Sequence, residues 1–144
     1  MEIITKSAEE TKELGRKIGS DLTSGKGGCR IFALTGNLGS GKTTFVQGFA
    51  EGLGVTSRII SPTFILMKTY KLQSGLNFYH LDLYRLENSL KQEIENLGLT
   101  DLWQNPLNII IIEWAEKIKD LMPRGTCWVK FETMNENERR INIE

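Results

Sequence analysis

The fold is decided by one stretch of sequence, Gly36-Asn37-Leu38-Gly39-Ser40-Gly41-Lys42-Thr43-Thr44. It reads G-x-x-x-x-G-K-T, the pattern typical of a loop that binds nucleotide phosphates. Residues 29–35 before it form an apolar run of strand length, and residues 43–53 after it carry apolar side chains at helical spacing. Strand, loop and helix in this order are the context that the motif requires. A chance glycine-rich turn with a surface lysine would need neither neighbour.

The chemistry of phosphate binding explains the spacing of this loop. Glycines allow the backbone to curl closely around an anion, and successive N–H groups then point inward. The positive end of the following helix dipole adds to the attraction. Lys42 is expected to reach the β- and γ-phosphates of a nucleoside triphosphate, and the Thr43 hydroxyl to bind Mg²⁺. The predicted nucleotide-binding residues are Gly36, Asn37, Leu38, Gly39, Ser40, Gly41, Lys42, Thr43 and Thr44.

The composition is that of an ordinary globular protein. The chain has 144 residues, which favours one domain spanning residues 1–144. The 18 basic and 18 acidic residues give a formal net charge of zero, which argues against extended binding to nucleic acid or to an anionic membrane. The longest apolar run, Ile109–Ile112, is too short to span a bilayer, and the first six residues lack the layout of a signal peptide. We therefore expect a cytoplasmic location.

The cysteine and histidine content argues against a metal cluster. Cys29 and Cys127 each stand in an apolar run without a C-x-x-C neighbour, so we interpret both as reduced, packed residues rather than a disulfide or metal pair. His80 is the single histidine, which excludes a cluster of histidine ligands.

The pattern along the chain predicts an α/β domain. Residues 108–113 form a continuous β-branched run that suits a strand covered on both faces, as in a parallel sheet. Residues 64–72 and 76–83 favour an antiparallel hairpin around the turn at 73–75. We expect a fold like that of P-loop nucleoside triphosphatases, in which a mixed sheet has a parallel core flanked by helices and an antiparallel hairpin.

The remaining elements follow from caps and breakers. Ser7, with Glu10 completing a capping box, starts a helix that runs to about Leu22. Gly52 and Gly54 are expected to close the helix after the loop. The other expected elements are an edge strand at residues 3–4, a helix from Asn88 or Ser89 to Leu97 stopped by Gly98, a helix at 114–121, and strands at 126–132 and 139–144.

Hydrolysis or transfer needs acidic groups beyond the loop, and two candidates stand out. Glu113 ends the apolar strand, where a second ligand of the metal or its hydration shell would lie; a solvated acid at a strand end is the alternative. Asp82 would share one face of its strand with His80 and Tyr84, which suggests a site, although a solvent-facing stripe has the same pattern. Lys42, Asp82 and Glu113 are the predicted catalytic residues.

Four further residues are candidates for switching or recognition. Ser61 and Thr63 flank a proline-fixed bend and could sense the γ-phosphate or the metal; an ordinary start of a strand is the alternative. Trp114 could stack on a base or a partner, and Arg85 could contact phosphate or a partner. The alternatives are that Trp114 only packs in the core and that Arg85 is only an exposed surface residue.

Four motifs in order, GNLGSGKTT, SPTF, HLDLYR and IIIEWAE, resemble those of the TsaE (YjeE) family. The resemblance covers nearly the whole chain, and although the loop by itself is generic, the four motifs together are specific. It implies a P-loop fold that binds ATP with Mg²⁺ and has weak ATPase activity of its own. It also implies a supporting role for the TsaB–TsaD complex, which forms threonylcarbamoyladenosine in the anticodon loop of tRNA.

The resemblance also implies roles for individual residues. Lys42 matches the phosphate-binding lysine, Thr43 a Mg²⁺ ligand and Glu113 the acid at the metal. Asp82 matches the acid of an H-x-D-x-Y-R motif, and Thr63 the threonine of the S-P-T-F switch. One departure is Asn37, since the family loop usually reads G-D-L-G; we expect binding to survive and turnover to be lower.

Two other functions share the same binding residues. A small-molecule P-loop kinase is the first, but no insert of lid length accompanies Arg85 or Arg124. A non-catalytic module whose assembly ATP controls is the second. A GTPase is disfavoured because no N-K-x-D sequence is present to recognise guanine.

Overall fold

The computed structural model describes residues 1–57, 59, 67–85 and 90–144. Within these ranges, seven strands form one sheet in the order β1-β7-β6-β2-β5-β4-β3. Ser61 and Thr63 of the predicted switch, and the predicted helix caps Asn88 and Ser89, lie outside the described residues. The strands are β1 (Glu2–Thr5), β2 (Ile31–Thr35), β3 (Met67–Lys71), β4 (Asn77–Asp82), β5 (Asn108–Glu113), β6 (Cys127–Thr133) and β7 (Arg139–Ile143).

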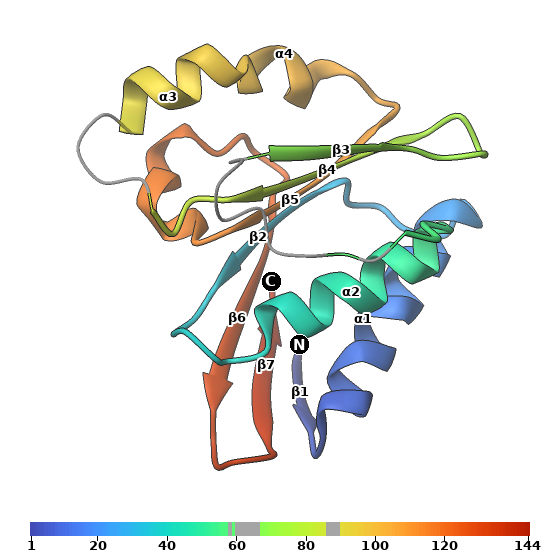
Figure 1. The fold of residues 1–144 in the computed structure, drawn as a ribbon, viewed down its shortest axis with the longest axis vertical. Helices are drawn as coiled ribbons and strands as arrows, with labels where there is room; N and C mark the ends of the chain where they lie inside the picture. Colours follow the sequence, from blue (N-terminus) through green and yellow to red (C-terminus); the bar gives the residue numbers. More distant parts are fainter. Residues whose placement is uncertain (58, 60–66, 86–89) are drawn as a thin grey trace.

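The sheet has the predicted mixed character, which Figure 1 shows. Strands β6, β2, β5 and β4 are parallel neighbours and form its centre. Strands β3 and β4 form the predicted antiparallel hairpin, while β7 pairs antiparallel with both β6 and β1. The phosphate loop therefore leaves the middle of the parallel core, with β5 on one side of β2 and β6 on the other.

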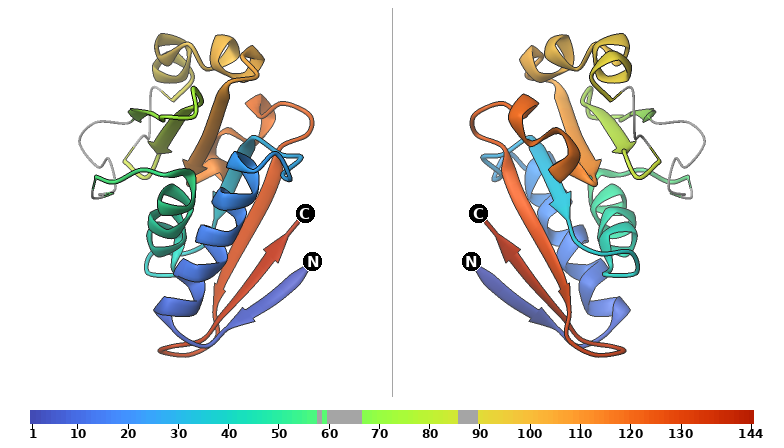
Figure 2. Two further views of the ribbon diagram at one scale, coloured as in Figure 1. Left: turned by 90° about the vertical axis from the view of Figure 1, so that its right-hand side faces the viewer. Right: turned by 90° about the vertical axis from the view of Figure 1, so that its left-hand side faces the viewer.

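The helices cover both faces of this sheet (Figure 2). Helices α1 (Ala8–Thr23) and α2 (Lys42–Leu53) pack together on one face. Helix α4 (Leu99–Gln104) and the 3₁₀ helix η1 (Ala115–Leu121) contribute Leu99, Ala115 and Ile118 to the core on the other face. Helix α3 (Leu90–Leu97) precedes α4, and Gly98 between them has φ 68°. Helix α4 was not expected from the sequence.

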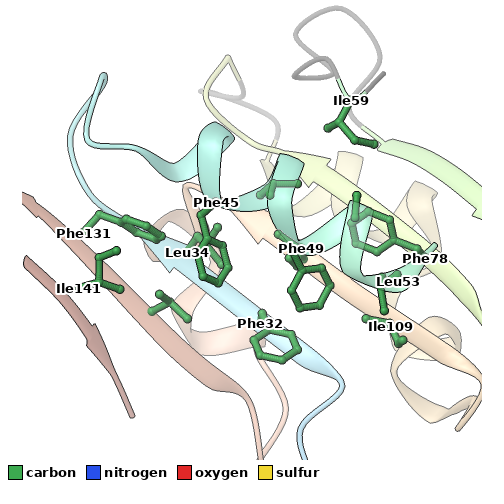
Figure 3. Packing of buried hydrophobic residues seen from close by; sticks show 14 residues of the cluster. Phe32, Leu34, Phe45, Phe49, Leu53, Ile59, Phe78, Ile109, Phe131 and Ile141 are labelled. Carbon is green, nitrogen blue, oxygen red and sulfur yellow. The ribbon is translucent and has the colours of Figure 1, made fainter. Parts of the chain in front are cut away.

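Aromatic side chains fix α2 against the sheet. Phe45 and Phe49 of α2 are fully buried, and Figure 3 shows them lying over β2 between Phe131 and Phe78. The Phe49 ring lies 5.1 Å from Phe32 in an edge-on arrangement, and the Phe45 ring lies 5.4 Å from Phe131. Since aromatic pairs at these distances hold defined geometries, this packing fixes the start of α2 relative to the end of β2.

Glycines allow α1 and α2 to approach closely. A Cβ at Gly48 would lie 1.9 Å from the carbonyl oxygen of Lys12, and one at Gly15 would lie 2.2 Å from that of Phe45. Gly52 lies inside α2 and makes the same kind of contact with α1, so the prediction that it closes the helix was wrong. Gly54, in the left-handed conformation, is the residue that caps α2.

The start of α1 agrees with the predicted cap in its main part. The Ser7 hydroxyl accepts from the Glu10 N–H at 3.1 Å. The Glu10 carboxylate accepts from the N–H of Lys6 at 3.2 Å, one residue before the position that a capping box would use.

Among the described residues, no helix has both the length and the apolar character needed to cross a membrane.

Candidate functional site

The loop between β2 and α2 has the backbone conformation that its glycines predict. Gly36 has φ 141° and Gly41 has φ 102°, values that side-chain-bearing residues rarely adopt. A Cβ at Gly36 would also lie 2.7 Å from the Phe131 carbonyl oxygen. The loop thus turns sharply at both ends, against β6 at its start and into α2 at its end.

The first turn of α2 is suited to binding an anion. Its N-cap, Gly41, offers no side-chain acceptor, and no acidic residue lies in the first turn. The N–H groups at this terminus and the positive helix dipole are therefore directed at the loop. The hydroxyl of Ser40 is buried in the same loop and has no hydrogen-bond partner. These features fit a bound phosphate, which supplies acceptors for such donors.

Lys42 lies at the centre of the site. The side chain is only 5% exposed, and its ammonium donates to the carbonyl oxygens of Gly36 and Asn37. The same nitrogen lies 3.9 Å from the centre of the Trp114 ring. Burial lowers the pKa of Lys42, while the nearby carboxylates of Glu113, Glu116 and Asp82 oppose that shift. A phosphate would offer this buried cation the full negative charge that two carbonyls lack.

The predicted acids converge beside the lysine. The Thr43 hydroxyl donates to Glu113 Oε1 at 3.2 Å, which joins the start of α2 to the end of β5. Asp82 is the register partner of Glu113 across the parallel β4–β5 pair. Both carboxylates are buried, at 6% and 2% exposure, so neither is a solvated strand-end acid. The structure therefore brings Lys42, Thr43, Asp82 and Glu113 together.

The sequence placed His80 on the same strand face as Asp82 but assigned it no individual role. It is fully buried, and its Nε2 lies 2.6 Å from Glu113 Oε2. The two oxygens of Glu113 are thereby held by two different residues, His80 and Thr43. His80 is placed to fix the orientation of Glu113, as residues behind a metal ligand commonly do.

The donor set suits Mg²⁺ only together with a phosphate. Within the described ranges, no three histidine, cysteine, aspartate or glutamate side chains are grouped so that they could hold a metal by themselves. Mg²⁺ usually takes one or two protein oxygens and completes its shell with water and substrate phosphates. Thr43 and Glu113 provide hard oxygen ligands of that kind.

Trp114 has a local role in the site. Among the residues that the structure describes, Trp114 is the only non-glycine residue with a positive φ, at 62°. It directly follows Glu113 at the start of η1. Its ring lies 5.0 Å from that of Tyr84 in addition to its contact with Lys42. Arg85 lies in the wall of the same pocket. Whether either residue contacts a base or a partner stays a prediction.

A pocket of about 420 Å³, which is within the range of small-molecule sites, is lined by the loop from Leu38 to Thr44 together with Asp82, Tyr84, Arg85, Glu113 and Trp114. Its wall also includes residues that the sequence did not single out, from the start of α1 and from the turn between β6 and β7. They could not be found from sequence because they are distant from the loop along the chain. These residues are Ala8, Thr11, Glu136, Asn137 and Arg139.

Most of the chain matches one protein family. The family model described as threonylcarbamoyl adenosine biosynthesis protein TsaE matches residues 5–141. The chain belongs to the TsaE family. The match spans β2 to β6 completely, together with the last residue of β1 and the first three residues of β7, and it includes all the site residues described above.

Individual TsaE proteins confirm the assignment. The tRNA threonylcarbamoyladenosine biosynthesis protein TsaE of Bacillus subtilis is 36% identical over 96% of this chain and 82% of its own length. The protein of the same name from Rickettsia felis is 38% identical over 98% of this chain and 78% of its own. That of Treponema pallidum is 31% identical over 99% of both chains.

A solved structure agrees with the fold. The crystal structure of YdiB from Bacillus subtilis superimposes with a TM-score of 0.76 at 29% identity. The alignment covers 99% of this chain and 83% of the other. The P-loop architecture predicted from the sequence is thus confirmed.

Proposed function

We propose that this TsaE family member binds ATP with Mg²⁺, hydrolyses it slowly, and supports the TsaB–TsaD complex in forming threonylcarbamoyladenosine in the anticodon loop of tRNA. The observation that carries the proposal is the meeting of Lys42, Thr43 and Glu113 at the mouth of a phosphate-type loop. Family membership supports the pathway, and the loop geometry supports the nucleotide.

Different residues of the chain would bind the phosphates and the Mg²⁺ ion. The glycine loop and the start of α2 would bind the phosphates through backbone N–H groups, and Lys42 would neutralise the terminal phosphates. Thr43 and Glu113 would hold Mg²⁺, which when bound neutralises charge that develops between the β- and γ-phosphates. Lys42 would have to exchange its bonds to Gly36 and Asn37 for phosphate oxygens.

Asp82 is the candidate for orienting the attacking water. It lies beside Glu113 in register, and its Oδ1 accepts from the Tyr84 N–H at 2.9 Å, which fixes the side chain. A carboxylate held at this edge of the sheet can accept a hydrogen bond from a water molecule directed at the terminal phosphate. Weak hydrolysis without partners fits a site in which part of the catalytic geometry comes from the complex.

The test is ATP hydrolysis by this chain alone and with purified TsaB–TsaD, each with and without the tRNA substrate. We expect slow turnover alone and a clear rise with the partners, and loss of the partner-stimulated rate in Lys42→Ala. A partner-dependent complex that forms with ATP but shows no added hydrolysis would favour an ATP-controlled assembly module. Phosphorylation of a small metabolite with no response to the partners would favour a kinase.

A further inference from the structure

The two cysteines of the chain, Cys29 and Cys127, are far apart in sequence, and neither lines the pocket of the phosphate loop. Both are free thiols in this structure, and both are half-buried. We propose that they form an oxidisable dithiol, in which Cys29 reacts with hydrogen peroxide or another small hydroperoxide and Cys127 then completes a reversible disulfide. The inference is independent of the proposed function, because none of its steps involves a nucleotide.

The strand register brings the two thiols together. Cys127 is the first residue of β6, and it is the register partner of Phe32 in β2. Just before β2, the Cys29 sulfur lies 3.3 Å from the carbonyl oxygen of Gly125, shortly before Cys127. The Cys127 thiol donates a hydrogen bond to the Cys29 sulfur, so the two sulfurs are already neighbours. Both side chains also pack against the same hydrophobic core.

The surroundings of Cys29 favour its thiolate. The Cys127 thiol donates to the Cys29 sulfur, and so do the backbone N–H groups of Ile31 and Cys127. These bonds and the positive charge of Arg30 outweigh burial and lower the pKa of Cys29 to about 7. Cys29 in turn raises the pKa of Cys127, which stays protonated. The pair thus contains one nucleophile beside one protonated thiol, as in cysteine pairs that respond to oxidants.

A small oxidant has access to this pair from both strands. Gly28, next to Cys29, is exposed, and nothing lies within 4 Å of a Cβ built there. Gly125, on the other strand, is exposed as well. Among the residues that the structure describes, no further histidine, cysteine or carboxylate joins the two thiols to form a metal site. We therefore expect an oxidant, rather than a metal ion, to be the reagent.

The oxidation takes two balanced steps. The Cys29 thiolate attacks one peroxide oxygen, so that an S–O bond forms, the O–O bond breaks and hydroxide leaves a sulfenic acid behind. The Cys127 sulfur then attacks the Cys29 sulfur; the S–S bond forms, the S–O bond breaks, and the departing hydroxide takes the Cys127 proton as water. The first hydroxide combines with the proton that Cys29 released on ionising. Overall, the two thiols lose two electrons and one peroxide becomes two waters.

The disulfide would join the start of β6 to the segment before β2. This is the end of β2 opposite the phosphate loop, as Figure 1 shows. A cross-link between residues so distant in sequence restricts the unfolded chain, so we expect the oxidised protein to unfold at a higher temperature. It would also protect Cys29 from irreversible oxidation to the sulfinic acid.

The test treats the whole protein with hydrogen peroxide at neutral pH and follows free thiols, intact mass and the thermal midpoint. We expect the wild type to lose both thiols and two hydrogen atoms without gaining oxygen, and to remain a single chain on a non-reducing gel. Its thermal midpoint should rise, and dithiothreitol should reverse the change. Cys127→Ser should gain oxygen at Cys29 instead, first as a sulfenic acid that dimedone traps. Cys29→Ser should react roughly tenfold more slowly than Cys127→Ser, because a thiol of ordinary pKa is largely protonated at this pH.

Cys127→Ala serves as a second variant without the resolving thiol, in case serine disturbs the start of β6. A wild type that gains oxygen as fast as Cys127→Ser and Cys127→Ala would overturn the proposal, since Cys127 would then resolve nothing. A disulfide that joins two chains, or two thiols that survive the peroxide, would overturn it as well. Equal rates in Cys29→Ser and Cys127→Ser would refute the assignment of Cys29 as the reacting thiol.

Discussion

His80 Nε2 and Glu113 Oε2 lie 2.6 Å apart in the interior of the sheet, on neighbouring parallel strands. Glu113 is also the acceptor for Thr43, so the carboxylate is held from two sides. The other ring nitrogen of His80 has no hydrogen-bond partner. A proton on Nε2 satisfies this arrangement, since the donor then faces the carboxylate.

Replacing His80 tests this positioning role. His80→Phe would leave Oε2 of the buried Glu113 without its donor, which should cost about 1–3 kcal/mol of unfolding free energy. His80→Gln, whose amide nitrogen reaches the position of Nε2, should keep most of the stability and of the Mg²⁺ dependence of ATP binding. Thermal unfolding and ATP titration at several Mg²⁺ concentrations measure both effects. Equal behaviour of the two variants in the Mg²⁺ titration would remove His80 from the site.

We expect Lys42 to lower the unfolding free energy of the protein. Burial lowers its pKa below 10.5, so the folded state disfavours its charged form. Lys42→Met should therefore raise the unfolding free energy, by about 1 kcal/mol at pH 7, while nucleotide binding is lost.

The sign of the pH dependence distinguishes this explanation from simple repacking. Between the lowered folded pKa of Lys42 and its unfolded value, the unfolded chain binds more protons, so wild-type stability rises with pH. The advantage of Lys42→Met should shrink as the pH approaches 10.5. Thermal midpoints of both proteins at pH 7 and pH 10 provide the comparison, and an advantage that grows with pH would refute the explanation.

The contact between α1 and α2 should tolerate no side chain at Gly48. Gly48→Ala would bring a methyl group against the Lys12 carbonyl, and it should destabilise the protein by roughly 1–3 kcal/mol or more. Gly28→Ala is the matched control, because nothing lies within 4 Å of a Cβ there. Urea unfolding measures both, and a Gly48→Ala protein as stable as Gly28→Ala would contradict the close packing.

Cys29 should react as a thiolate near neutral pH. A hydrogen bond from the Cys127 thiol lowers the pKa of Cys29 to about 7, and Cys29 in turn raises the pKa of Cys127. Because the thiolate is the reactive form, alkylation of the half-buried Cys29 by iodoacetamide should rise with pH around a midpoint near 7. Cys127→Ala should move the midpoint upward and Cys127→Ser less so. A midpoint that Cys127→Ala leaves unchanged would exclude this pairing.

The sequence predicted those parts of the structure that depend on local patterns. The loop at 36–44, the buried strand ending at Glu113 and the hairpin strands each have a signature within a few residues, and each is confirmed. The meeting of Thr43 with Glu113 also followed, because strands of a parallel sheet present their carboxyl ends at one edge.

Features that depend on distant segments were not predicted. The contact of Gly48 with Lys12 needs the crossing of two helices, and nothing in the local pattern of either helix specifies it. The bond from His80 to Glu113 needs the register of β4 on β5. Likewise, Arg139 reaches Gly39 only because β6 neighbours β2, which places the β6–β7 turn beside the phosphate loop.

Calorimetric titration of ATP, with Mg²⁺ and with a chelator in its place, tests the central claim most directly. The site predicts saturable binding that weakens without Mg²⁺, is abolished in Lys42→Ala, and is retained in Lys130→Ala, which removes an exposed lysine paired with Glu132. A Lys42→Ala protein that binds ATP with wild-type affinity would contradict the claim that this loop is the nucleotide site.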